Sequence, residues 1–293
     1  MQETRPPELA SLHEGIAAVA AALPGRLGVL IRYLEQGLEA RFSAEDLFPA
    51  ASVIKLPIMV EVYRQAEEGI LSLDERLPLI PEEATGGSGV LQYLHQGLDL
   101  TVADAVELMI VVSDNTATNL LLRRVGPEAV NGTMQELGLS CTRTAGPIRG
   151  PNARPGLMNM SRTTPAETAA LLTWMARGEL FGPAASAAMR TILERQMVDE
   201  MLPRYLPITS YPERDRPVPG ITLAHKTGSL SGVRNDVGIL SVETAAGRQS
   251  AVISAFAADV DDGNLWTVEN VASRAVAEVG RLVYETLLRL AVV

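Results

Sequence analysis

The chain has 293 residues, 47% hydrophobic and 20% charged, an ordinary balance for a large globular fold with a sizeable core. A formal net charge of −10 and an aromatic content of only 4% argue against a nucleic-acid partner, which would need a basic surface and stacking rings. The single cysteine, Cys141, excludes an internal disulfide, and the three scattered histidines show no metal-ligand spacing. We therefore expect no metal and no cofactor.

No apolar run reaches the length of about 20 residues that a membrane-spanning helix requires. The first residues also lack a basic segment followed by a long apolar one, the pattern of a secretory signal. Two compartments stay open from the sequence: the cytoplasm, or the exterior after removal of a signal. We expect a monomer.

Apolar residues divide the chain into successive blocks. Residues 7–22 are typical of an amphipathic helix, and residues 26–43 hold two short β-type runs around a Gln-Gly turn, which predicts a hairpin. From Ser52 to about Gln196 the spacing of apolar residues is overwhelmingly helical. The first two blocks thus predict a helix and strands, followed by a helical middle.

Two helix starts stand out in the helical block. Thr101 and Asp104 have the spacing of a capping box, in which each residue's side chain bonds the other's backbone N–H. Thr164, Pro165 and Glu167 suit the N-cap, first and third positions of another helix, and we expect Glu167 to serve that cap.

The last block is rich in strands. After the proline-rich connection YPERDRPVPG, β-type runs follow at residues 221–227, 235–243 and 248–259. The chain then ends in a predicted helix from about Leu265 to Leu290.

This order predicts an α/β fold of the α+β type. We expect a sheet of about five antiparallel strands, flanked by the N- and C-terminal helices, with an all-α domain inserted into it. The expected sheet domain is residues 1–48 plus 197–293, and the expected helical domain is residues 49–196. The active site would lie in the cleft between them.

Both lysines of the chain fall in short motifs that can carry chemistry. In Ser52-x-x-Lys55, at the start of an apolar helix, residues three apart share a face, so the hydroxyl and the amine would meet. A serine is a weak nucleophile without a base beside it. Lysine can be that base if burial and nearby positive charge lower its pKa from about 10.4, whereas arginine stays protonated. Pro57 would lie near the first turn, where its missing N–H costs least.

Two further motifs follow in chain order. Residues 113–115, S-D-N, end a buried-looking run and supply a hydroxyl that can relay a proton and an amide that can hold a substrate carbonyl. Residues 226–228, K-T-G, end a predicted edge strand, where a lysine and a threonine can bind a substrate carboxylate.

Together the three motifs resemble those of the class A serine β-lactamases, within the penicillin-recognising enzymes. The segments SVIKLPI, VSDNTATNLLL and HKTGSLSGVRNDVGIL carry the resemblance, which runs from about Gly25 to the C-terminal helix. It implies an α/β sandwich with an all-α domain and the active site between them, which agrees with the layout predicted from the residue pattern.

The resemblance implies roles for the motif residues. Ser52 would be the acylated nucleophile, and Lys55 would be its base. Ser113 would pass a proton to the β-lactam nitrogen, and Asn115 would bind the substrate's side-chain amide.

The third motif would hold the other end of the substrate. The resemblance implies that Lys226 and Thr227 bind the substrate carboxylate and that the N–H groups of Ser52 and Ser229 form the oxyanion hole. Arg234, on the next strand, resembles the family's additional carboxylate-binding arginine, and a solvated strand residue is the alternative.

One family motif is missing. Class A enzymes carry E-x-x-L-N between S-D-N and K-T-G, and its glutamate activates the water that frees the acyl-enzyme. Here residues 137–166 contain no Asp or Glu. Asn152 and Asn159 are candidates for positioning a water, although loop asparagines commonly serve turns. A general base contributes about 10²–10⁴-fold, so we expect acylation with slow deacylation.

Three functions stay open at this point. The first is a β-lactamase-family hydrolase with slow turnover. The second is a DD-peptidase-like or esterase-like serine hydrolase on the same scaffold, and the third is a penicillin-binding or sensing module that is acylated without turnover. The expected partner is a small-molecule β-lactam or a peptidoglycan-like peptide or ester.

Overall fold

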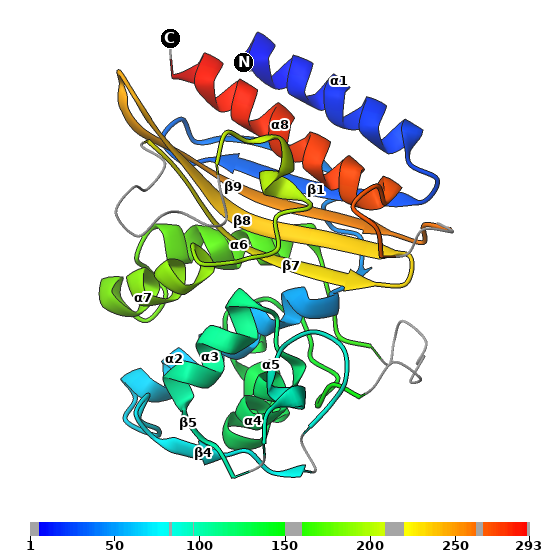
Figure 1. The fold of residues 1–293 in the computed structure, drawn as a ribbon. Helices are drawn as coiled ribbons and strands as arrows, with labels where there is room; N and C mark the ends of the chain where they lie inside the picture. Colours follow the sequence, from blue (N-terminus) through cyan, green and yellow to red (C-terminus); the bar gives the residue numbers. More distant parts are fainter. Residues whose placement is uncertain are drawn as a thin grey trace.

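A computed structural model describes residues 6–81, 84–95, 97–149, 160–208, 220–261 and 266–291. One sheet crosses the middle of the molecule, with α1 and α8 on one face and the other labelled helices on the opposite side (Figure 1). The predicted class, a sheet flanked by the terminal helices with a helical insertion, is confirmed.

The central sheet has five antiparallel strands in the order β2-β1-β9-β8-β7. Their bounds are β1 Arg26–Tyr33, β2 Leu38–Phe42, β7 Ile221–Leu230, β8 Val233–Thr244 and β9 Gly247–Ala258. The predicted hairpin is confirmed, since β1 pairs with β2 around a turn in which Gly37 has a φ of 67°. The three predicted C-terminal strands are also confirmed, and β7 forms one edge of the sheet.

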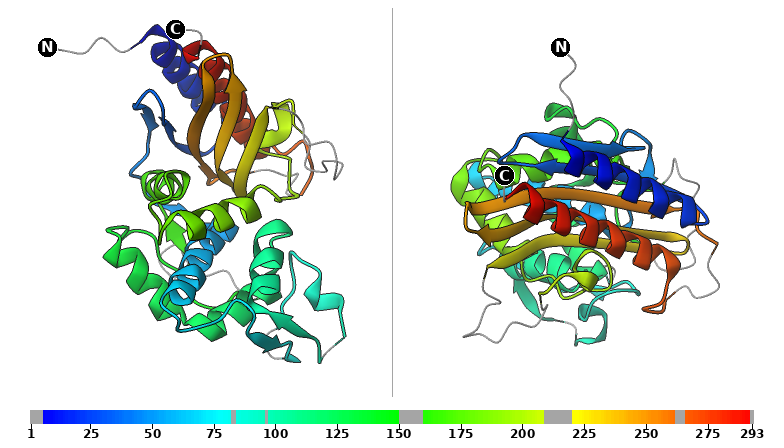
Figure 2. Two further views of the ribbon diagram at one scale, coloured as in Figure 1. Left: turned by 90° about the vertical axis from the view of Figure 1, so that its left-hand side faces the viewer. Right: turned by 90° about the horizontal axis from the view of Figure 1, so that it is seen from above.

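The outer face of the sheet is covered by α1 (Pro7–Ala22) and α8 (Val271–Leu290), which run side by side across it (Figure 2). The last helix begins later than predicted. Asn270 caps it by accepting hydrogen bonds from the N–H groups of Ala272 and Ser273, while Leu265 lies outside the described residues. Within the described ranges, no helix has both the length and the apolar character that a bilayer span needs.

The other side of the sheet carries the remaining helices. They are α2 Lys55–Glu67, α3 Val102–Val111, α4 Asn115–Val125, α5 Pro127–Glu136, α6 Pro165–Ala176 and α7 Pro183–Leu193. Short strands join this part: β3 Phe48–Pro49 pairs with β6 Arg162–Thr163, and β4 Arg76–Pro78 pairs with β5 Asp99–Thr101. The described residues also form the short 3-10 helices η1 Ala51–Ile54, η3 Leu91–Tyr93 and η5 Leu202–Tyr205, the last of which packs on α8.

Both helix starts singled out in the sequence are confirmed. Thr101 and Asp104 form a complete capping box at α3. At α6, Thr164 is the N-cap and accepts from the N–H of Glu167, with Pro165 at the first position. The proposed division into two domains stays a prediction.

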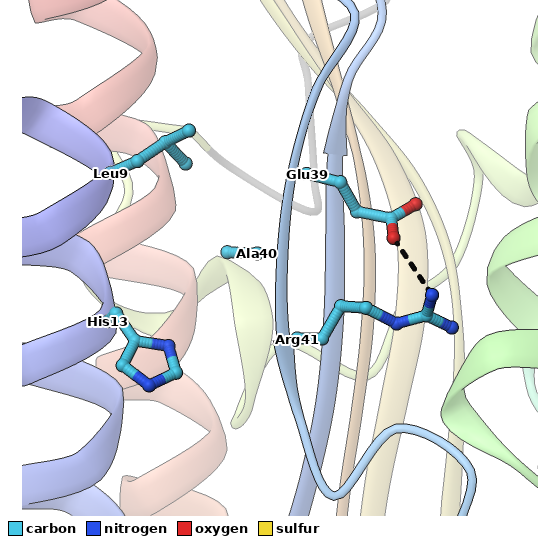
Figure 3. Close-up of a pocket in the computed structure, with 5 residues that line it drawn as sticks. All are labelled: Leu9, His13, Glu39, Ala40 and Arg41. Atoms are coloured by element: carbon cyan, nitrogen blue, oxygen red, sulfur yellow. Dashed lines mark ion pairs between the residues drawn. The ribbon is translucent and has the colours of Figure 1, made fainter. Parts of the chain in front are cut away.

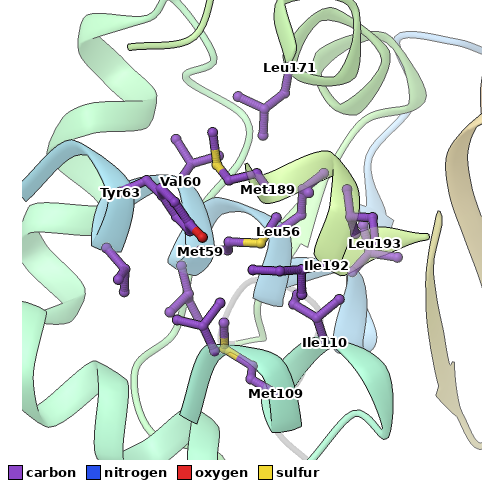
Figure 4. Close-up of a cluster of buried hydrophobic side chains, with 14 of the residues drawn as sticks. Leu56, Met59, Val60, Tyr63, Met109, Ile110, Leu171, Met189, Ile192 and Leu193 are labelled. Atoms are coloured by element: carbon purple, nitrogen blue, oxygen red, sulfur yellow. The ribbon is translucent and has the colours of Figure 1, made fainter. Parts of the chain in front are cut away.

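Helix α2 runs through the centre of the helical part. Its buried side chains Leu56, Met59 and Val60 lie among side chains from α3, α6 and α7, including Met109, Leu171, Met189 and Ile192 (Figure 4). A helix that is buried on nearly all sides is fixed by packing in every direction. The packing therefore holds Lys55, the first residue of α2, in a defined place.

Candidate active site

Ser52 lies in a tight turn that approaches the edge strand β7. It belongs to η1, directly before α2, and the preceding Ala51 has a φ of 46°, a left-handed conformation that non-glycine residues rarely adopt. A Cβ atom added at Gly228 of β7 would lie 3.0 Å from the Ser52 backbone nitrogen and 2.9 Å from that of Val53. Only glycine fits there, so the third K-T-G residue lets the strand reach the turn.

Lys55 is fully buried and makes three hydrogen bonds. Its Nζ atom donates to the Ser113 carbonyl oxygen at 2.6 Å, to Ser113 Oγ at 3.1 Å and to Asn115 Oδ1 at 2.8 Å. Burial lowers the pKa of Lys55 well below its ordinary value, and the charge of Lys226 lowers it further, while Asp114 opposes the shift. The S-x-x-K lysine is therefore bound to the S-D-N motif.

Lys226 is the second buried amine. Its Nζ atom donates to Ser113 Oγ at 3.1 Å and to the Thr227 carbonyl oxygen at 2.8 Å. Burial lowers the pKa of Lys226 from 10.5 to about 7, against the opposing charge of Asp236. Both lysines of the chain thus lie at hydrogen-bond distance from one hydroxyl group, that of Ser113.

The S-D-N turn is held from two sides. Ser113 has a φ of 55°, a second left-handed non-glycine residue at this site, and such outliers gather where surrounding structure enforces them. The Asp114 carboxylate accepts from the N–H groups of Val90 and Leu91 and caps α4 by accepting from the N–H of Ala117. No role for Asp114 was predicted from the sequence, although its place before a helix is typical of an N-cap.

Asn115 uses both ends of its amide. Oδ1 accepts from Lys55, and Nδ2 donates to the carbonyl oxygen of Gly86 at 3.0 Å. A Cβ atom at Gly87 would lie 2.6 Å from the same Nδ2 atom. The glycines before Val90 therefore let the loop pack closely on the motif.

The carboxylate-binding candidates lie together at the end of β7. Thr227 is buried and Ser229 is half-buried, and Ser229 pairs in register with Arg234 of β8. Arg234 is only 2% exposed, so it is not the solvated strand residue considered as the alternative. Its Nη1 atom donates to the Leu230 and Val233 carbonyl oxygens, and its guanidinium lies 4.9 Å from the ring centre of Trp266.

One expected contact is not formed. Across the described part of the chain, the Ser52 hydroxyl makes no hydrogen bond, and none joins it to Lys55. The Lys55 amine instead lies among three oxygens, and one of them, the Ser113 hydroxyl, can donate to a neutral amine as well as accept from a protonated one. Catalytic hydrogen bonds are often long before substrate binds, and the Ser52–Lys55 pairing stays a prediction.

The segment after α5 holds no carboxylate near the motifs. Glu167 does not complete a capping box as expected: its carboxylate accepts instead from the Cys141 N–H at 2.9 Å and from Thr142 Oγ1 at 2.6 Å. The cause is the isolated antiparallel bridge between Arg143 and Arg162, which brings this segment alongside the start of α6. Asn152 and Asn159, the water-positioning candidates, lie outside the described residues.

A separate hollow lies far from these motifs. It measures about 230 Å³ and lies between α1 and β2, with Leu9, His13 and Ala40 on its walls (Figure 3). Glu39 and Arg41 form an ion pair and point away from α1. Because β2 and β7 are opposite edges of the sheet, this hollow is not part of the candidate active site.

A half-buried serine, two desolvated amines and a bridging hydroxyl define a serine acyl-transfer type of site. A family model described as "Beta-lactamase enzyme family" matches residues 11–287 of the chain. The chain belongs to this family of β-lactamase-like serine hydrolases.

Comparisons with individual proteins support this family assignment. The β-lactamase of Sphaerobacter thermophilus superposes with a TM-score of 0.82 at 32% identity, covering 96% of this chain and 98% of that one. An acyl-enzyme complex of a leucine-to-glutamate variant of PBP-A with penicillin G gives a TM-score of 0.79 at 28% identity, covering 97% and 99%. Beta-lactamase L2 of Stenotrophomonas maltophilia is 32% identical over 171 residues, which are 56% of this chain and 54% of that protein. The chain thus spans about half the length of this curated relative.

Proposed function

We propose that this protein opens the amide bond of β-lactams by acylation of Ser52 and releases the acyl group slowly. One observation carries the proposal: Ser113 Oγ lies 3.1 Å from the amines of both Lys55 and Lys226, and both amines are fully buried. Burial and the nearby charge of Lys226 lower the pKa of Lys55 well below its ordinary value, which favours its neutral form. A neutral lysine is a base that can accept a serine proton.

The acylation step follows from these groups. Ser52 Oγ attacks the β-lactam carbonyl carbon, and its proton passes to the neutral amine of Lys55. The negative oxygen that forms is held by the N–H groups of Ser52 and Ser229, and the close approach of Gly228 to the Ser52 nitrogen supports this pairing. The C–N bond then breaks, and the leaving nitrogen takes the Ser113 hydroxyl proton, which the Lys55 ammonium replaces.

Recognition of the substrate rests on positive charge at the end of β7. Lys226 and Thr227 would hold its carboxylate, with Arg234 on the neighbouring strand adding a second cation. Asn115 donates to Gly86 in the structure, so its second N–H would serve the substrate's side-chain amide.

Slow release of the acyl group is inferred from the missing base. Residues 137–166 contain no carboxylate, and that of Glu167 is bound to Cys141 and Thr142. A structural neighbour, the PBP-A variant, is described as an acyl-enzyme with penicillin G, which supports formation of such a species here. Without a general base, we expect deacylation to be slower by about 10²–10⁴-fold than in enzymes that have one.

Three substrates separate this proposal from its alternatives. We expect a fluorescent penicillin to label the protein one-to-one and to remain for hours, with only slow steady turnover of nitrocefin. Rapid hydrolysis of a D-Ala-D-Ala ester without nitrocefin turnover would favour the peptidase-like function. Labelling with no turnover of any substrate would favour a sensing module. A Ser52→Ala variant that is still labelled would contradict all three.

A further inference from the structure

Asn235 forms hydrogen bonds with the backbone directly before the candidate nucleophile, Ser52. Its side chain is fully buried, and Nδ2 donates to the carbonyl oxygens of Pro49 at 2.8 Å and Ala50 at 3.2 Å. Two carbonyl acceptors fix the orientation of the amide, because only its NH₂ end can donate to them. No role for Asn235 was predicted from the sequence.

In the sheet, Asn235 lies beside Gly228, which also approaches this turn closely. It pairs in register with Gly228, so the two residues face the turn from neighbouring strands. A Cβ atom at Gly228 would lie 2.9 Å from the Ala50 carbonyl oxygen, the same atom that accepts from Asn235. One strand thus approaches the turn closely, and the other holds it by hydrogen bonds.

The two carbonyls that accept from Asn235 precede a strained residue. This residue, Ala51, has a φ of 46° and lies between Ala50 and Ser52. A left-handed alanine persists only where its surroundings enforce it, and here the two bonds from Asn235 fix the residues before it. The direction in which Ser52 presents its hydroxyl and its N–H depends on this conformation.

Asn235 also differs from structural asparagines of the same chain. Its Oδ1 atom is buried and has no hydrogen-bond partner in the described residues. In contrast, Asn119 donates to the carbonyl of Ile148 and accepts from its N–H. Asn131 does the same with the carbonyl and N–H of Thr144. A side chain selected only for stability would satisfy both ends, because a buried unpaired acceptor is unfavourable.

We infer that Asn235 is a positioning residue for acylation: through the carbonyls of Pro49 and Ala50 it holds the turn that aims Ser52 at the substrate. This inference rests on the proposed function, in which Ser52 is the nucleophile. It adds a residue outside the three motifs, on the strand next to K-T-G.

The first test compares two asparagine substitutions at a temperature where all variants are folded. Asn235→Ala should slow acylation by a β-lactam by about 10²-fold, the effect of a nucleophile displaced by about 1 Å. Asn270→Ala is the matched control, since Asn270 is equally buried and bonds backbone at the start of α8. It should lower the melting temperature and leave the acylation rate per folded molecule unchanged. Equal acylation rates in Asn235→Ala and the wild type would overturn the inference.

A second variant separates the effect of the two hydrogen bonds donated by Asn235 from the effect of its side-chain packing. Asn235→Asp keeps the size and shape but presents two acceptors to two carbonyl oxygens at neutral pH. Once protonated, the carboxyl can donate one of the lost bonds. The acylation rate of Asn235→Asp relative to wild type should therefore rise as the pH is lowered toward about 5. A ratio that stays constant with pH would contradict a role for the donated bonds.

Hydrogen exchange keeps the inference testable even if no β-lactam acylates the wild type. The Ala50 and Val53 amides, which donate to the carbonyl oxygens of Ser161 and Ala50, should exchange faster in Asn235→Ala than in wild type, while those of α8 keep their protection. Failure of wild type to be labelled would then contradict the proposed function alone. Unchanged exchange at Ala50 and Val53 would contradict the positioning role alone.

Discussion

The Nζ atom of Lys55 lies 2.6 Å from the carbonyl oxygen of Ser113 and 3.1 Å from its hydroxyl oxygen. This contact joins the first motif to the second, and Lys226 completes the group from the third. The Ser113 hydroxyl is therefore the shared group through which a proton can pass between the amines and a leaving nitrogen.

Removing that hydroxyl should impair acylation without unfolding the protein. Ser113→Ala takes away the proton donor for the leaving nitrogen, and we expect the acylation rate to fall by about 10²–10⁴-fold. Stopped-flow measurement of nitrocefin ring opening in a single turnover checks this. Ser186→Ala is the control, since this buried serine lies in the first turn of α7 and its hydroxyl bonds the backbone N–H and carbonyl of Leu180. Acylation of Ser113→Ala at the wild-type rate would remove Ser113 from the mechanism.

The two amines predict a bell-shaped pH dependence of acylation efficiency. Lys55 must be neutral to act as a base, so efficiency rises with pH through its lowered pKa. Lys226 binds the carboxylate only while it is protonated, so efficiency falls as pH rises through about 7. Second-order acylation rates measured across pH test both limbs. Lys226→Arg should move the falling limb out of the measurable range, because arginine stays protonated.

Gly228 should tolerate no side chain. In Gly228→Ala the new Cβ would meet the Ser52, Val53 and Ala50 backbone at 3.0 Å or less, so the turn or β7 must shift. We expect acylation to fall by about 10²-fold, because a displacement of about 1 Å is enough for that loss. Gly132→Ala is the control: it lies in α5 with open space around it, and there alanine should stabilise the helix by about 0.5–1 kcal/mol. Wild-type acylation in Gly228→Ala would show that the close approach is not needed.

A carboxylate placed in the loop should speed release of the acyl group. Asn119 lies one turn after Asn115 on α4 and bonds both the N–H and the carbonyl of Ile148, so this loop residue is held beside the motif helix. Ile148→Glu should shorten the lifetime of the penicillin adduct by about 10-fold or more, as a general base would. The uncharged Ile148→Gln should leave the lifetime unchanged. Equal adduct lifetimes in both variants would place the deacylating water elsewhere.

The sequence predicts the local parts of this molecule well. The capping box at Thr101, the N-cap at Thr164 and the β1–β2 hairpin each depend on residues within a few positions of one another, and all are confirmed. The family and the fold were also predictable, because the three motifs recur in a fixed order at helix starts and a strand end.

Contacts between distant segments were not predictable in the same way. Nothing near Asn235 in the sequence indicates that it bonds Pro49 and Ala50, which are about 185 residues away. Glu167 has the spacing of a capping residue, yet the bridge between Arg143 and Arg162 brings Thr142 within its reach. Helical spacing predicts that Lys55 meets Ser52, but it does not indicate that the amine also binds the oxygens of Ser113 and Asn115.

The central claim is that Ser52 becomes acylated and stays so, and its most direct test is a time course of intact mass after mixing with penicillin G, followed by peptide mapping. We expect the mass to rise by one whole penicillin, with the adduct on the peptide that contains Ser52, and to persist for hours. An unchanged mass in wild type, or an adduct that maps to another residue, would contradict the account.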